Sequence, residues 1–386
     1  MDFLSLENLA RQLSDLEVAL FLCFVAREHC LIETSADLID DLAQELALIS
    51  THSFDFTFSI LDCSAQTLTD DLYNGVLTAN ARKGQERPSS TRLRSGSVSV
   101  SLLLFPFLYD NDSANFLKSS NLSTLVAARD RGQSRSPAPR STTEETNVVN
   151  VVIAKNFNLV DHEIQLQALQ LMRSRRLIME PRTLIAPADF LFIPLVVRES
   201  DQLQPPLNGH LNENLIVSHF HAAVDGFVYL EEDDWLSDDR QSASSVIHIP
   251  KNQQQRSAKV GETMIEKLRE ASELVTASAE VVRYIQDIIV FLRLSRAVGG
   301  GISAKANSHL AHFARLLAPL HGIDYLTPSI VALAARKVLR HRIIVANPDR
   351  DRSLLYGSDL QMVSRILANV TADSILDGVL VLEPPI

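Results

Sequence analysis

The amino-acid sequence predicts an α/β domain built on a parallel sheet, followed by a domain that is entirely α-helical. Two near-continuous apolar runs, at residues 148–154 and 190–197, have the composition of strands buried on both faces, as in a parallel sheet. Around them, apolar residues recur at helical spacing, and beyond residue 259 the spacing is helical throughout. Strands that alternate with helices, and then helices alone, are typical of a sheet domain joined to a helical domain.

Local signals place the individual elements. Ser14 and Glu17 stand three residues apart before an apolar run, which is the pattern of a capping box and predicts a helix over residues 14–30. The alternating, β-rich stretch at 56–63 predicts a strand. The other expected elements are strands at Leu31–Ile32 and 215–220, and helices at 37–50, from 69, and at 161–176, 261–295, 303–319, 327–344 and 358–367.

Composition marks two interruptions in the chain. Residues 81–146 are rich in Arg, Ser and Pro, which predicts a disordered insert. Inside it, the apolar run at 98–109 is compatible with a local strand, an interaction motif or an artefact of the gene model. Residues 231–258 are acidic and then polar, which predicts a linker. The α/β domain is therefore expected in two parts, 1–80 and 147–230, and the helical domain at 259–386.

The overall charge limits the classes of partner. The formal net charge of −11 argues against binding to nucleic acid or to an anionic membrane, because both need a basic face. Cys23, Cys30 and Cys63 form no CxxC pair and are expected to be buried free thiols in a reducing compartment. The first residues show no basic and then apolar leader. We therefore expect an intracellular, cytoplasmic protein that has no nucleic-acid or membrane partner.

Segments along most of the chain resemble the AAA+ ATPases of the MoxR and magnesium-chelatase I-subunit group. The family pattern H-x-L-L-E-G-P-P-G-x-G-K-T is similar to residues 29–33 up to the phosphate loop itself. The family's Walker B segment resembles residues 154–158, with Gln165, Leu169 and Met172 following in register. The lid signatures G-x-S-x-R-A, G-R-D-Y-V-T-P and V-L-x-H-R and the family's closing segment resemble residues 301–306, 322–328, 338–342 and 375–380. The resemblance implies an AAA+ type parallel sheet core with helices on both faces, an all-α lid domain, and Mg-ATP as cofactor.

The resemblance places the phosphate loop at residues 34–41, where the residue types that hold a phosphate are missing. Thr34, Asp37 and Ile39 stand at the aligned glycines, and Asp40 and Asp41 stand at the aligned Lys and Thr. Glycines let backbone N–H groups close around a phosphate, Lys reaches the β- and γ-phosphates, and the hydroxyl holds Mg²⁺. Asp37, Asp40 and Asp41 are instead expected in the first turn of a helix, where they satisfy its dipole and repel a triphosphate.

Two other interpretations of residues 34–41 do not depend on nucleotide. The segment can be an ordinary helix start in which Thr34 or Ser35 caps the helix. Alternatively, the carboxylates of Asp37, Asp40 and Asp41 can hold a metal ion.

The remaining catalytic positions of the family also carry other residue types here. The Walker B Asp organises Mg²⁺ and its Glu polarises the attacking water, but the aligned residues are Lys155 and Asn156. Glu213 stands at the arginine finger and reverses its charge, and the sensor 1 position falls near Val197. Only sensor 2 keeps its sign, as Lys305.

A separate pattern, His219-Phe220-His221, places two imidazoles on one face of a strand, which is a partial transition-metal site. A polar strand end is the plain alternative.

These observations lead to one main hypothesis and two alternatives. The concerted loss of the phosphate loop, Walker B and arginine finger favours a non-catalytic AAA+-like module in protein assembly or regulation, without cofactor and with weak or no nucleotide binding. Its partner is a protein or another copy of itself. The alternatives are an active chelatase-like or MoxR-like ATPase that uses Mg-ATP to drive metal insertion or to remodel a partner, and a metal-binding protein that uses His219 and His221.

Overall fold

A computed structural model describes residues 3–77, 148–179, 182–198, 207–230 and 260–381 of the chain. The predicted insert at 81–146, with its apolar run, and the predicted linker at 231–258 lie outside these ranges.

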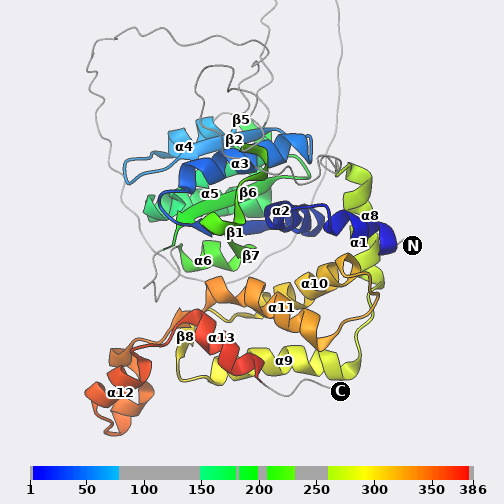
Figure 1. Cartoon of the computed structure of the whole chain (residues 1–386). Helices are drawn as coiled ribbons and strands as arrows, with labels where there is room; N and C mark the ends of the chain where they lie inside the picture. Colours follow the sequence, from blue (N-terminus) through cyan, green and yellow to red (C-terminus); the bar gives the residue numbers. More distant parts are fainter. Residues whose placement is uncertain (1–2, 78–147, 180–181, 199–206, 231–259, 382–386) are drawn as a thin grey trace, which may run out of the picture. The chain divides into compact units, whose positions relative to one another are not determined.

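Five strands form a parallel sheet (Figure 1). They are β1 (His29–Thr34), β2 (Phe58–Asp62), β3 (Val151–Lys155), β6 (Leu191–Val197) and β7 (Leu215–Phe220), in the order β2-β3-β6-β1-β7. Every neighbouring pair in this order is parallel. The carboxyl ends of the strands therefore meet at one edge of the sheet, which we call the carboxyl edge, and the amino ends meet at the opposite, amino edge. The fold class predicted from the sequence is confirmed.

Helices cover both faces of the sheet. One face is covered by α2 (Asp15–Ala26) and α3 (Ile39–His52), and the other by α4 (Thr69–Val76), α5 (His162–Ser174) and α6 (Gly209–Glu213). The neighbours Leu31 and Ile32 are both fully buried, yet they belong to the apolar clusters of opposite faces. Successive side chains of a strand point to opposite sides, so a strand that is buried on both sides needs a continuous apolar run.

The C-terminal part is a helical domain that belongs to the same compact unit as the sheet. Its helices are α8 (Glu262–Leu274), α9 (Ala279–Leu294), α10 (Ala304–Leu320), α11 (Pro328–Leu339), α12 (Leu360–Leu367) and α13 (Ala372–Leu380). It also contains a short antiparallel pair, β8 (Val298–Gly300) with β9 (Ile344–Val345), which the sequence did not predict. The helix α1 (Phe3–Ala10) and the antiparallel hairpin of β4 (Arg176–Met179) with β5 (Arg182–Ile185) were likewise unpredicted.

The predicted single helix over 261–295 is wrong, because the chain breaks between α8 and α9. At the break the backbone N–H of Thr276 donates to the carbonyl oxygen of Asp324, and Thr276 accepts from the N–H of Leu326, each over 2.9 Å. The hydroxyl of Ser278 then accepts from Val281 and caps α9. Pairing with a distant segment has replaced helical hydrogen bonds at residues that local spacing alone would make helical.

Three other predicted helices are too long at their C-terminal ends. The helix over 14–30 ends at Ala26 and the helix over 161–176 ends at Ser174, in each case before an Arg with left-handed backbone. The φ angles are 54° at Arg27 and 51° at Arg175, a conformation that ends a helix and is more usual for Gly. The helix over 327–344 ends at Leu339, because Ile344 and Val345 pair with β8.

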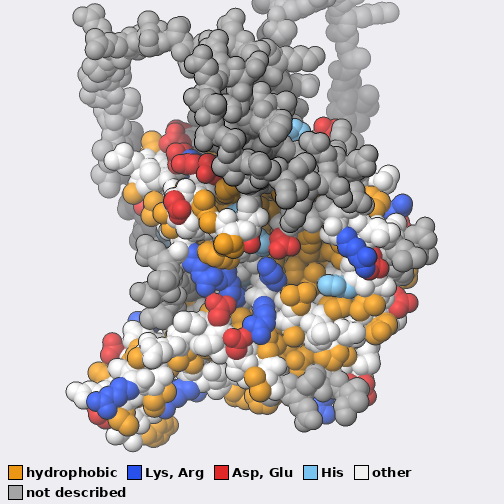
Figure 2. Space-filling view, in the orientation of Figure 1, with side chains coloured by type: hydrophobic (Ala, Val, Ile, Leu, Met, Phe, Trp, Pro, Cys, Tyr) orange, Lys and Arg blue, Asp and Glu red, His pale blue; other side chains and the backbone are white. Residues whose placement is uncertain are grey.

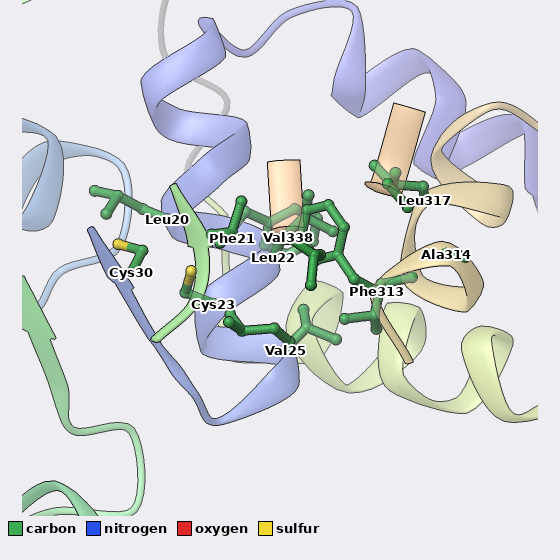
Figure 3. Close-up of a cluster of buried hydrophobic side chains, with 14 of the residues drawn as sticks. Leu20, Phe21, Leu22, Cys23, Val25, Cys30, Phe313, Ala314, Leu317 and Val338 are labelled. Atoms are coloured by element: carbon green, nitrogen blue, oxygen red, sulfur yellow. The ribbon is translucent and has the colours of Figure 1, made fainter. Parts of the chain in front are cut away.

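Helix α2 is buried on nearly all sides. Its residues Leu20 to Val25 are each 3% exposed or less. Figure 3 shows Leu20 beside Cys30 of β1 on the sheet side. Phe21, Leu22 and Val25 lie among side chains of the helical domain, which are Phe313, Ala314 and Leu317 of α10 and Val338 of α11. Because a helix that is apolar all round must be covered on all sides, α2 joins the sheet to the helical domain.

The buried, neutral side chain of His29, the first residue of β1, contacts the backbone of both β6 and α5. Its Nδ1 accepts a hydrogen bond from the backbone N–H of Phe192 over 3.0 Å, and its Nε2 lies 3.4 Å from the carbonyl oxygen of Met172. Burial lowers the pKa of His29 to about 4. Protonation of Nδ1 would remove the acceptor that holds the N–H of Phe192.

We therefore expect acid to destabilise the protein partly through His29. The unfolded chain has a His pKa of about 6.5, so between pH 6.5 and about 4 it binds more protons than the folded chain. The stabilising free energy is fully present above pH 6.5 and is lost as the pH falls, by up to about 3 kcal/mol for this residue. Urea unfolding measured across this pH range should show that the free energy of unfolding falls less steeply with decreasing pH in His29→Gln than in the wild type. The same dependence on pH in both proteins would contradict the prediction.

Candidate functional site

The segment aligned with the phosphate loop lies at the carboxyl edge, between β1 and α3. Thr34 is the last residue of β1, and its hydroxyl donates to the carbonyl oxygen of His221 over 3.0 Å. Helix α3 begins at Ile39, and Leu38 before it makes no side-chain capping bond. The predicted cap by Thr34 or Ser35 is therefore wrong.

The three carboxylates of this segment are not equivalent. Asp40 and Asp41 lie in the first turn of α3, as predicted, where the positive end of the helix dipole stabilises their negative charges. Asp37, expected in the same turn, lies before the helix, where a hydrogen bond with the Ser35 side chain lowers its pKa. Among the described non-glycine residues, those with positive φ are Arg27, Asp55, Asn156 and Arg175, so residues 34–41 contain no left-handed turn. A backbone nest that closes around an anion alternates right- and left-handed residues, and this connection lacks that alternation.

The central contact of the site is an ion pair across the carboxyl edge. The ammonium group of Lys155, at the end of β3, lies 2.6 Å from Oδ1 of Asp40 and 3.4 Å from Oδ2 of Asp62, at the end of β2. The side chain of Lys155 is only 14% exposed, whereas Asp40 is 70% exposed. Burial lowers the pKa of Lys155, but the hydrogen bond to Asp40 and the charge of Asp62 outweigh it and raise the pKa. The ammonium group therefore stays charged and paired at neutral pH.

Asn156 follows Lys155 and turns the chain away from the sheet. Its φ of 54° is left-handed, a conformation that Asn adopts more readily than most residues. Its backbone N–H donates to the carbonyl oxygen of Leu195 on β6 over 2.8 Å. Val197, near the predicted sensor 1 position, is the last residue of β6 and pairs with Thr34 of β1.

A second polar contact at the carboxyl edge joins β1 to the helical domain, and sequence reasoning missed it. Glu33 forms an ion pair with Arg340, which directly follows α11. Beside it, Arg198 lies 3.0 Å from Asp373 of α13. Burial raises the pKa of Glu33 to about 7, while the positive charge of Arg198 opposes the rise. Glu33 and Arg340 are 307 positions apart, so no local signal links them.

Two of the predicted nucleotide-site residues lie elsewhere. Lys305 donates a hydrogen bond to the side-chain oxygen of Asn214, the residue before β7. Burial lowers the pKa of Lys305, and the negative charge of Glu28, just before β1, opposes this. Glu213 is the last residue of α6 and also precedes β7. The structure thus brings Asp40 and Lys155 together at the carboxyl edge but places Lys305 and Glu213 at the amino edge.

The two predicted imidazole ligands are buried at the end of β7. The rings of His219 and His221 lie with their centroids 6.4 Å apart, and the Nε2 atom of each has no hydrogen-bond partner. Burial, together with the positive charge of Lys337, lowers the pKa of His219 to about 4. In the part of the chain that the structure describes, no three His, Cys, Asp or Glu side chains are arranged to hold a metal ion. The geometry does not favour a metal site here or at Asp37, Asp40 and Asp41.

Comparisons with known proteins agree with this architecture. A family model for the AAA lid domain matches residues 291–361. A solved structure of a "putative ATPase" from Cytophaga hutchinsonii superimposes with a TM-score of 0.51, covering 92% of this chain and 88% of that one at 15% identity. At that identity the likeness is one of fold alone. The chain therefore has an AAA+ ATPase-like fold with a lid domain.

Two curated yeast proteins match shorter segments. Both are named maintenance of telomere capping protein 2, one from Lachancea thermotolerans and one from Kluyveromyces lactis. They are 30% identical over 111 residues and 29% identical over 90 residues, or 28% and 22% of this chain. The matched segments span only 39% and 33% of these relatives.

Among the helices that the structure describes, none has the length and apolar character needed to cross a membrane.

We expect the Asp40–Lys155 contact to be a measurable but modest ion pair. A double-mutant cycle with Asp40→Asn, Lys155→Met and both changes together should give a coupling of about 0.5–1 kcal/mol in urea unfolding, because Asp40 is largely exposed. The coupling should shrink in about 1 M salt, where charges near the surface are screened. Coupling indistinguishable from zero at low salt would contradict the assignment.

Proposed function

We propose that this protein is a non-catalytic AAA+-like module of the MoxR or magnesium-chelatase type that acts in protein assembly or regulation. It binds Mg-ATP weakly or not at all. The observation that carries the proposal is the ion pair between Asp40 and Lys155. In the family that this chain resembles, the position of Asp40 is held by the Lys that binds phosphate, and the position of Lys155 by the Asp that organises Mg²⁺. The two charges are therefore exchanged here and neutralise each other.

The exchange removes each interaction that a nucleotide would need at this edge. A triphosphate would meet the carboxylates of Asp40 and Asp41, each costing a few kcal/mol at an effective dielectric constant of about 20. An ammonium group at Lys155 repels Mg²⁺, and the amide of Asn156 cannot accept a proton from water at neutral pH. The connection between β1 and α3 offers no left-handed residue to form a nest. These residues do not fit Mg-ATP.

Contacts between sheet and lid support a structural role. Glu33 with Arg340, Arg198 with Asp373, and Asn212 with the carbonyl oxygen of His341 all join the two parts without a nucleotide between them. Together with the buried helix α2, they hold the lid against the sheet. Such a module presents a fixed surface to a protein partner or to another copy of itself. The names of the two yeast relatives suggest telomere capping as one setting for this role.

Calorimetric titration of the full chain with Mg-ATP tests the proposal. We expect no binding, or binding weaker than millimolar. Micromolar affinity that disappears after changes at Asp37, Asp40 or Asp41 would contradict it. The matched variant Asp40→Lys/Asp41→Thr/Lys155→Asp restores the family's residues while it keeps an opposite pair at 40 and 155. Its affinity for Mg-ATP should exceed that of the wild type by at least about tenfold, since close repulsions are removed.

The main alternative is an active chelatase-like or MoxR-like ATPase, which the AAA+ ATPase-like fold favours. Steady ATP hydrolysis by the purified chain, lost on changing Asp41 or Lys305, would support it and would overturn the non-catalytic proposal. A metal-binding role for His219 and His221 rests only on their unpartnered Nε2 atoms. Metal analysis of the purified protein would reveal it.

A further inference from the structure

A cavity of about 860 Å³ lies at the amino edge, away from the Asp40–Lys155 pair. Helix α6, which precedes β7, forms one wall. The other walls come from the helical domain: the end of α9, the β8–β9 pair, the turn into α10, and residues 350–352. The volume is in the range of small-molecule sites, about 300–1,000 Å³.

Arginines dominate the charge of this cavity. Its lining includes five arginines, Arg293, Arg296, Arg342, Arg350 and Arg352, against the two acids Glu213 and Asp351. Asp351 is already engaged, because its carboxylate lies 2.7 Å from Nε of Arg296. Figure 2 shows Lys and Arg side chains, with Asp and Glu side chains among them, between the sheet and the helical domain. The lining of this cavity is therefore locally positive in a chain whose net charge is −11.

Arg342 is the buried member of these arginines, and it is only 2% exposed. Its Nε donates a hydrogen bond to Nε2 of His341 over 3.3 Å. Its Nη2 contacts the carbonyl oxygen of Leu215 and Nδ1 of His309, whereas its Nη1 has no partner. Burial lowers the pKa of Arg342 to about 10, and the negative charges of Glu213 and Glu28 oppose this, although no described carboxylate forms an ion pair with it. A buried cation with a free donor is costly unless an anion pairs with it.

The backbone of the cavity wall also suits an anion. Residues 301–303, which lead into α10, line the cavity, and the first turn of a helix carries a partial positive charge. Gly301 has a φ of +92°, and a side chain there would lie 1.7 Å from the carbonyl oxygen of Arg342. Glycine is therefore required for the turn to approach Arg342 this closely.

We propose that this cavity binds a small molecule that carries phosphate groups. Arg342 lies at its inner wall, and the exposed residues Arg293, Arg350 and Arg352 lie around it. Guanidinium groups match phosphate oxygens with paired hydrogen bonds, and a molecule with several phosphate groups can pair with several of these arginines at once. A volume of about 860 Å³ is of the size that small molecules occupy in proteins. Binding would join α6 to the helical domain and stabilise the folded chain.

The test is titration of the full chain with inorganic tripolyphosphate, without metal and at constant low ionic strength. We expect saturable binding and a raised Tm for the wild type. The variant Arg350→Glu/Arg352→Glu changes two exposed residues, so it should fold, and its affinity should fall at least about tenfold. The control Lys267→Glu/Arg365→Glu makes the same charge change at exposed positions outside the cavity and should stay within about twofold of the wild type.

Absence of binding to the wild type would overturn the proposal, as would equal weakening in both variants or none in Arg350→Glu/Arg352→Glu. The variant Asp40→Asn/Lys155→Met separates this site from the carboxyl edge. If it loses tripolyphosphate while the cavity variant keeps it, the phosphate site lies at the carboxyl edge and the proposal fails. Titration with ATP and ADP without Mg²⁺ identifies the source of the phosphate. Tighter binding of ATP than of tripolyphosphate supports the proposal with a nucleotide as ligand, and equal binding supports it with the phosphate groups alone recognised.

Discussion

The burial of helix α2 between the sheet and the lid helices is the constraint on which the rest of the structure depends. Because Leu20 to Val25 are almost completely covered, neither part of the chain can bury its own apolar surface without the other. Even the buried carboxylate of this helix, Glu17, is satisfied internally, since it accepts hydrogen bonds from Ser53 and Tyr229. One face of the sheet and the lid therefore share a single apolar cluster.

Charged side chains at the carboxyl edge are paired within the chain. Here Lys155 is neutralised by Asp40 and Asp62, and Glu33 by Arg340, all from within the chain. The charged groups of these residues at the carboxyl edge are therefore paired with other side chains of the chain. Among the described residues that line the cavity at the amino edge, Arg342 is a buried arginine without an ion pair.

The sequence was informative where a signal is local. Continuous apolar runs located the buried strands, and the Ser14–Glu17 pair located the start of α2, where the capping box is present. Helix ends were missed at Arg27 and Arg175, because arginine gives no local sign that it will adopt a left-handed backbone. The break between α8 and α9 was missed because pairing of Thr276 with a distant segment decides it. The resemblance to a family pointed to Asp40 and Lys155 as unusual residues. Their contact with each other could be seen only in the structure, because they are 115 positions apart in the sequence. The same resemblance grouped Lys305 with them, although it lies at the other edge.

The most direct test of the central claim is hydrogen–deuterium exchange of the full chain with and without millimolar Mg-ATP. If the Asp40–Lys155 pair and the β1–α3 connection leave no place for a nucleotide, peptides that cover residues 34–42 and 153–157 will exchange at the same rate in both conditions. Slower exchange of these two peptides when Mg-ATP is present would show that the carboxyl edge still holds a nucleotide, and would contradict the account.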